Sequence, residues 1–178
     1  MVRLMQPYNL TQLAVPGAYR IEGPIHTDSR GSFVAPIRSN SPRVVLRNYA
    51  NVYVSYNTSK YTLRGFHMQR PPYGENKIVT AITGSALHVI VTIDSHRNVV
   101  VSHNHLNSKN ISTFVPANSA SAFLTLEPDT TILYLSDSPY NSESAEGYLW
   151  NDPAIGFDWG VTLDQLTISE RDLNFPLI

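Results

Sequence analysis

The stretch T-L-R-G-F-H-M-Q-R-P-P, residues 62–72, groups side chains that are well suited to chemistry. Arg64 stands three residues before His67 in a run that otherwise has the composition of a strand, and the run ends at a double proline. A structural histidine would account for His67 alone. The neighbouring arginine and the prolines instead favour a strand that ends inside a binding cavity, since proline cannot continue the hydrogen bonding of a sheet.

A second candidate is Lys77, which is followed by the apolar residues Ile78 and Val79. Burying a lysine among apolar side chains is costly unless an anion lies beside it. The position of Lys77 therefore favours a functional role, independently of any resemblance to known proteins.

A metal site would need three convergent ligands. No H-x-H motif follows His67, and the chain has no cysteine, which excludes disulfides and thiolate metal sites. His103 and His105 do form an H-x-H, but they precede the polar residues Asn107 and Ser108, so we expect a solvated loop there. The sequence therefore predicts neither a metal nor another cofactor. It also lacks the G-x-S-x-G, G-x-G-x-x-G and phosphate-loop motifs.

Composition sets the broad class. The chain has 178 residues, 42% hydrophobic and 15% charged, which is ordinary for a globular protein and predicts a single domain over residues 1–178. The net charge is −1 and no block of lysines or arginines occurs, which argues against nucleic-acid binding. No apolar run has the length of a membrane span, and no secretion signal opens the sequence. We expect a cytoplasmic protein with no membrane partner.

The segments that contain these residues are short and rich in valine, isoleucine, threonine and aromatic residues, which predicts β-strands. Turn signals occur at residues 83–85, 95–98, 107–110 and 127–129. About eight strands at this spacing predict an all-β sandwich or jelly-roll barrel, followed by an irregular C-terminal cover with a helical turn near Asp164. The expected strands are residues 44–57, 63–69, 77–82, 86–93, 99–103, 112–116, 122–126 and 131–135.

A series of motifs in fixed order carries a resemblance to a known family. It resembles the dTDP-4-dehydrorhamnose 3,5-epimerase family of nucleotide 4-keto-sugar epimerases, from about residue 21 to the C-terminus. The resemblance implies a cupin-type jelly roll, in agreement with the strand pattern. The motifs are D-S-R-G-S-F at 28–33, L-R-G-F-H-M-Q at 63–69, P-P at 71–72, N-K-I-V at 76–79, residues 116–123, Leu133-Tyr134, Tyr140 with Glu146, W-N-D-P at 150–153 and I-S-E-R-D at 168–172.

The resemblance implies a nucleotide-linked 4-keto-6-deoxy sugar as substrate, whose carbonyl acidifies the protons on C3 and C5. Inverting such a carbon needs a base on one face, an acid on the other, and positive charge near the ketone oxygen. His67 matches the family's base, and its neutral imidazole suits that task near pH 7. Asp172 matches the carboxylate that orients this histidine, and Tyr134 matches the acid.

The remaining matches concern substrate contacts. Lys77 and Arg64 match cations that contact the sugar, with Lys77 as the stabiliser of the enolate. Arg30 matches a residue that reaches the substrate from the diphosphate side, from the other subunit of a dimer. Gln69 and Tyr140 belong to the same motifs and are expected to bind substrate.

The sequence also departs from the family pattern. Ser121 stands where the family commonly has a second active-site histidine, and His88 stands where it has a strand aspartate. We expect His88 to project its imidazole into the space that the missing histidine would fill. His26 stands for an aromatic residue near the first motif. These positions help to hold the nucleotide or the sugar, so the base, the choice of hexose or heptose and the carbons inverted stay open.

The resemblance thus implies an epimerase, acting at C3, C5 or both, in the biosynthesis of a surface polysaccharide or a glycosylated metabolite. Two alternatives stay open: a non-catalytic sugar-binding cupin, and a keto-sugar ketoisomerase of the same fold. The resemblance also implies a homodimer in which an exchanged N-terminal strand completes the partner's sheet, because an unpaired sheet edge favours such pairing. Arg30 would then act in trans.

Overall fold

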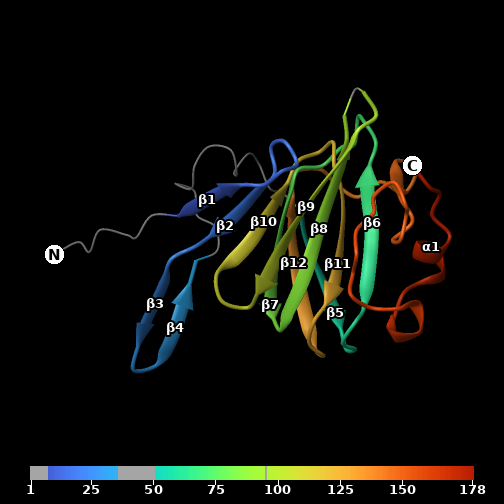
Figure 1. Cartoon of the computed structure of the whole chain (residues 1–178). Helices are drawn as coiled ribbons and strands as arrows, with labels where there is room; N and C mark the ends of the chain where they lie inside the picture. Colours follow the sequence, from blue (N-terminus) through green and yellow to red (C-terminus); the bar gives the residue numbers. More distant parts are fainter. Residues whose placement is uncertain (1–7, 36–50, 95) are drawn as a thin grey trace.

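An antiparallel sheet of 11 strands curls into a half-barrel (Figure 1). The computed structural model describes residues 8–35, 51–94 and 96–178. The main path of the sheet runs β13-β6-β11-β8-β9-β10-β7-β12-β5, and β2, which pairs with β1, joins it at β10. The strands are β1 (Asn9–Gln12), β2 (Tyr19–Glu22), β5 (Asn51–Asn57), β6 (Leu63–Gln69), β7 (Lys77–Thr83), β8 (Ser85–Ile93), β9 (Val99–Asn107), β10 (Ile111–Val115), β11 (Ala120–Thr125), β12 (Thr130–Ser136) and β13 (Ala145–Gly147).

The curl brings the two ends of the sheet face to face, so that β6, β11 and β8 lie opposite β7, β12 and β5 (Figure 1). Alternate residues of each strand point into the interior, as the pleat requires. One buried apolar cluster joins Val79 and Ile132 from one side to Ile90 and Phe123 from the other. This cluster closes part of the interior and leaves the polar positions of the same strands around a cavity.

The C-terminal segment covers the outer side of β6, β8 and β11. Trp150 and Trp159 pack with Leu63, Phe66 and Val89 in a second apolar cluster. The 3₁₀ helix η1 (Leu163–Gln165) and the short helix α1 (Glu170–Leu173) lie in this segment. The cover is therefore held by apolar burial, and it brings α1 next to β6.

A separate hairpin of β3 (Ile25–Asp28) and β4 (Gly31–Val34) extends away from the half-barrel (Figure 1). Its side chains are exposed except that of Val34, which is half-buried, and Phe33 is 64% exposed although it is a large apolar residue. Two strands of four residues each have little stability of their own in water.

The prediction of an all-β, cupin-type jelly roll is confirmed, and the expected helical turn near Asp164 is η1. Two sequence-based expectations about elements were wrong. β9 continues to Asn107, so His103 and His105 lie on the exposed face of a strand and not in a solvated loop. The four N-terminal strands and β13, which lies in the part expected to be irregular, were not predicted. The first part of the strand expected at 44–57 lies outside the described residues. No helix in the described part of the chain is long and apolar enough to cross a membrane.

Candidate active site

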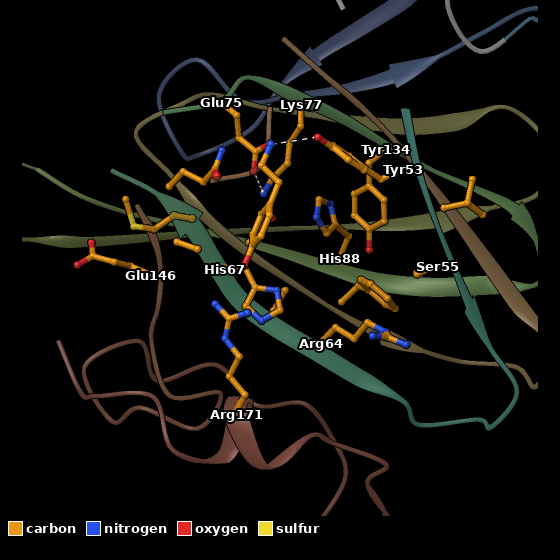
Figure 2. A pocket seen from close by; sticks show the side chains of 18 residues that line it. Tyr53, Ser55, Arg64, His67, Glu75, Lys77, His88, Tyr134, Glu146 and Arg171 are labelled. Carbon is orange, nitrogen blue, oxygen red and sulfur yellow. Dashed lines mark hydrogen bonds and ion pairs between the residues drawn. The ribbon is translucent and has the colours of Figure 1, made fainter. Parts of the chain in front are cut away.

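A cavity of about 460 Å³ lies between the two ends of the curled sheet. Eight of the residues singled out from the sequence line it, and they come from both sides of the half-barrel (Figure 2). They are Arg64, His67 and Gln69 of β6, Lys77 of β7, His88 of β8, Ser121 of β11, Tyr134 of β12, and Tyr140.

His67 forms a hydrogen-bonded pair with Asp172. Its Nε2 lies 2.8 Å from Asp172 Oδ1, and the imidazole is 41% exposed while the carboxylate is buried. Burial alone would raise the pKa of Asp172, but the hydrogen bond and charge of His67, with smaller effects from the Gly65 N–H and Ser169, lower the pKa below its usual value. An ionised carboxylate at this distance orients the ring.

Local geometry explains why glycine separates Arg64 from the histidine. Gly65 has φ +122°, and a Cβ added there would lie 2.5 Å from the Cβ of Ala122 on the neighbouring strand. The Gly65 N–H donates a 3.1 Å hydrogen bond to Asp172 Oδ2. Since Ser169 caps the N-terminus of α1 by accepting from the Asp172 N–H, the carboxylate is fixed from both sides.

Lys77 has the anionic partner that its burial requires. Its Nζ lies 3.3 Å from Glu75 Oε1, and the two side chains are 9% and 16% exposed. The other oxygen of Glu75 accepts a 2.6 Å hydrogen bond from Ser136. The ammonium is thus held at the cavity wall by an adjacent carboxylate (Figure 2).

Tyr134 enters the cavity from β12, which lies near the end of the sheet opposite to β6. Burial raises the pKa of Tyr134 to about 12, while a hydrogen bond to Ser55 and the charge of Arg64 act against that rise. The phenol therefore keeps its proton at neutral pH and can donate it. In Figure 2 its hydroxyl points into the space that His67 borders from the other side.

Two guanidinium groups border the same space. Arg64 is anchored by a 2.9 Å hydrogen bond from its Nε to Asn57 Oδ1. Arg171 extends from α1 into the cavity (Figure 2), and its guanidinium lies over the ring of Phe175, 5.5 Å from the centroid. The Phe175 ring also contacts His67, at 5.6 Å between centroids. Positive charge therefore concentrates at the α1 side of the cavity.

Gln69 and Tyr140 shape another part of the wall. The Gln69 side-chain N–H groups donate to the carbonyl oxygens of Tyr73 and Pro139, and its Oε1 accepts a 2.6 Å hydrogen bond from Asn141 N–H. The amide is largely used in these bonds, so Gln69 holds the loop that carries Tyr140.

His26 and Arg30 do not reach the cavity of their own chain. Both lie on the hairpin of β3 and β4, where Arg30 forms an exposed ion pair with Asp28 and His26 packs beside Phe33. Any contact that they make with substrate in this fold would have to be in another subunit's cavity.

Several cavity residues escaped the sequence analysis: Tyr53, Ser55, Glu75 and Arg171. Arg171 is adjacent to Asp172 in the I-S-E-R-D motif, and Glu75 precedes Lys77 by two residues. Their nearness in sequence to predicted site residues could have identified both. No group of three or more histidine, aspartate or glutamate side chains that could hold a metal occurs among residues 8–35, 51–94 and 96–178.

The model of one protein family, described as dTDP-4-dehydrorhamnose 3,5-epimerase, matches residues 12–178. The chain belongs to this family. The resemblance inferred from the motifs is therefore confirmed. A family member from Methanothermobacter thermautotrophicus, named dTDP-4-dehydrorhamnose 3,5-epimerase, is 31% identical over 180 residues, covering 96% of this chain and 95% of its own length. A Streptomyces protein named dTDP-4-dehydro-6-deoxyglucose 3-epimerase is 30% identical over 186 residues, covering 93% of this chain and 87% of its own length.

Solved structures of the family share the fold. The dTDP-4-dehydrorhamnose 3,5-epimerase of Bacillus anthracis, whose crystal structure contains TDP and pyrophosphate, superposes with a TM-score of 0.87 at 26% identity. The superposition covers 96% of this chain and 99% of that one. The half-barrel, the hairpin and the C-terminal cover thus belong to an architecture that the family uses.

Proposed function

We propose that the protein is an isomerase that epimerises a nucleotide-linked 4-keto sugar at C3, C5 or both through an enolate. The observation that carries this proposal is the convergence of the His67–Asp172 pair, the protonated phenol of Tyr134 and the ammonium of Lys77 on one cavity. A base and an acid that enter from opposite sides are what inversion of a carbon beside a ketone requires.

In the proposed reaction His67 takes the proton from the carbon next to the ketone, and Asp172 stabilises the imidazolium. The electron pair moves onto the ketone oxygen, where Lys77 stabilises the negative charge of the enolate. Tyr134 then delivers its proton to the same carbon from the opposite face. The configuration is inverted, and proton exchange with solvent restores His67 and Tyr134.

The cations Arg64 and Arg171 are suited to the diphosphate, since guanidinium groups bind phosphate oxygens through paired N–H donors. The family relatives include both a 3,5-epimerase and a 3-epimerase of dTDP-linked sugars. We therefore propose a nucleoside diphosphate 4-keto sugar as substrate, in the biosynthesis of a polysaccharide or a glycosylated metabolite. We place the enzyme in the cytoplasm as part of the same proposal.

The test is to incubate the protein with several nucleotide 4-keto sugars in D₂O and to locate deuterium by NMR. Deuterium at C3, C5 or both, with inversion, identifies the reaction. His67→Asn should reduce exchange at every carbon by about 10²–10⁴-fold, because no proton can leave. Tyr134→Phe should retain exchange and lose inversion. Exchange with a moved carbonyl would indicate a ketoisomerase, and no exchange with any substrate would indicate a sugar-binding protein.

We also propose a homodimer. Strand β5 exposes Val52, Val54 and Tyr56, at 58%, 43% and 74%, with Val54 also bordering the cavity, and a dimer would bury these apolar side chains. The exposed hairpin that carries His26 and Arg30 would pack against the partner and bring Arg30 to its cavity.

Sedimentation at micromolar concentration tests the dimer, and subunit mixing tests the trans contact. If Arg30 acts in the partner's cavity, mixing inactive Arg30→Ala with inactive His67→Asn protein should restore activity, because mixed dimers then contain one complete site. A mixture that stays inactive after subunit exchange would contradict the trans role. An active monomer would contradict the dimer.

A further inference from the structure

His88 is a buried histidine without a hydrogen-bond partner in the wall of the cavity. Its side chain lines the cavity from β8 but is only 1% exposed. Its Nδ1 is fully buried and has no hydrogen-bond partner among the residues that the structure describes. In Figure 2 the ring is drawn between Lys77 and Tyr134.

Buried polar groups in folded proteins nearly always have partners, because leaving one unpaired costs the desolvation of that group. Among the described residues, Arg20 Nε and the hydroxyls of Ser112 and Ser119 are also buried without a partner, but only His88 of this group lines the cavity. Asn104 on the neighbouring strand β9 donates to both Ser112 O and Thr113 Oγ1, at 3.3 and 2.9 Å. The unpaired imidazole therefore indicates a partner that binds in the cavity.

Ser121 supplies a second polar group beside the imidazole. It is paired with His67 of β6 on one side and with Ile90 of β8 on the other, so its side chain is a diagonal neighbour of His88 on the same face of the sheet. Ser121 also lines the cavity. The two side chains thus form one polar patch of the cavity wall, next to His67.

The charge of this patch restricts what it can bind. Burial, and to a smaller extent the charge of Lys77, lowers the pKa of His88 to about 3, so the ring is neutral and cannot serve as a base near pH 7. A neutral imidazole donates one hydrogen bond and accepts another. A hydroxyl group of a ligand does the same, whereas a phosphate or carboxylate would bind better near Arg64 and Arg171.

We propose that His88 and Ser121 form a hydroxyl-binding subsite, which holds the sugar by its hydroxyl at C2 or C3 while the ketone faces Lys77. This inference rests on the proposed function, since it assumes that the cavity binds a nucleotide-linked sugar. The patch would therefore make sugars that carry this hydroxyl bind more tightly than their deoxy counterparts.

The test measures binding with unreactive probes by calorimetry: TDP, dTDP-glucose, and the 2-deoxy and 3-deoxy forms of dTDP-glucose. The wild-type protein should bind dTDP-glucose about 10- to 100-fold more tightly than one of the two deoxy sugars, because that sugar leaves the patch unpaired. His88→Phe should bind all three sugars alike, and Ser121→Ala should lose part of the difference. His88→Gln, which keeps a donor and an acceptor, should retain part of it.

Two controls separate this subsite from the rest of the proposal. Ser112→Ala removes a buried, unpartnered hydroxyl that does not line the cavity, and it should leave the discrimination unchanged. TDP should bind the wild type and all variants equally. Because the nucleotide base is open, a wild type that does not bind TDP is tested with UDP, GDP, CDP and ADP and with their glucose forms, and binding to none of these would contradict the proposed function itself. If TDP and dTDP-glucose bind but the wild type does not discriminate, or if His88→Phe discriminates as the wild type does, the subsite is refuted. Should His88→Phe not fold, the wild-type and Ser121→Ala data decide in the same way.

Discussion

Lowering the pH from 8 to 5 should destabilise the protein through His88. A histidine in the unfolded chain has a pKa of 6.5, whereas burial and Lys77 lower the pKa of His88 to about 3 in the folded state. Because the folded pKa is the lower one, the unfolded chain binds the proton first as the pH falls. The free energy of unfolding is therefore unaffected by His88 above about pH 6.5, and it decreases progressively as the pH falls toward 3.

The magnitude follows from the two pKa values. At pH 5 the unfolded histidine is almost fully protonated and the folded one is neutral, and each pKa unit corresponds to 1.36 kcal/mol, so His88 should contribute a loss of about 2 kcal/mol relative to pH 8. The chosen interval avoids Asp172. The pKa of Asp172 is lowered below its ordinary value of 3.8, so its contribution to stability disappears only in more acidic solution.

The assay is urea unfolding at pH 8 and pH 5, at one protein concentration, followed by the fluorescence of the buried residues Trp150 and Trp159. The wild type is compared with His88→Gln, whose amide does not titrate, and with His103→Gln, which replaces an exposed histidine on the adjacent strand β9. Between pH 8 and pH 5 the free energy of unfolding of His88→Gln should fall by about 2 kcal/mol less than that of the wild type, and that of His103→Gln should fall as in the wild type. Equal losses in the wild type and in His88→Gln would refute the burial of a neutral imidazole.

Three further predictions concern the base and its surroundings. Gly65→Ala should lower the free energy of unfolding by about 3 kcal/mol or more, measured by urea denaturation, because the added Cβ meets Ala122 and φ is positive; a change near zero would contradict the close approach. Asp172→Asn should reduce deuterium exchange by about 10²-fold or more while the fold stays intact by circular dichroism, since an amide cannot stabilise the imidazolium; exchange at the wild-type rate would show that the carboxylate is dispensable. Activity should survive exhaustive chelation with EDTA, and a loss that a divalent metal restores would direct attention to His103 and His105.

The sequence predicted most of what lies on long, regular strands. The alternation in β8 and the motif around His67 predicted strands correctly, because in a pleated strand successive side chains point to opposite faces. The N-terminal strands were missed because four residues such as N-L-T-Q give too short a pattern. His103 and His105 were misplaced because β9 presents polar residues on its solvent face and also buries Asn104, so its end resembled a loop.

The site itself depended on contacts that no local pattern contains. The bond from the Gly65 N–H to Asp172 joins residues 107 positions apart, and only the docking of α1 on β6 makes it. Arg171 went unnoticed because it is an exposed charged residue, and only the placement of α1 shows that it also borders the cavity, with its guanidinium over the ring of Phe175.

The dependence of His67 on a carboxylate from α1 has a consequence for synthesis and degradation. The strands of the half-barrel leave the ribosome before residues 170–173 do, so a nascent chain can close its sheet while the histidine still lacks its acidic partner. A chain trimmed before α1 would keep the apolar interior between Val79 and Ile90 and lose the pair. Under the proposed role of His67, an activity measurement would therefore distinguish chains that contain α1 from chains that are cut before it.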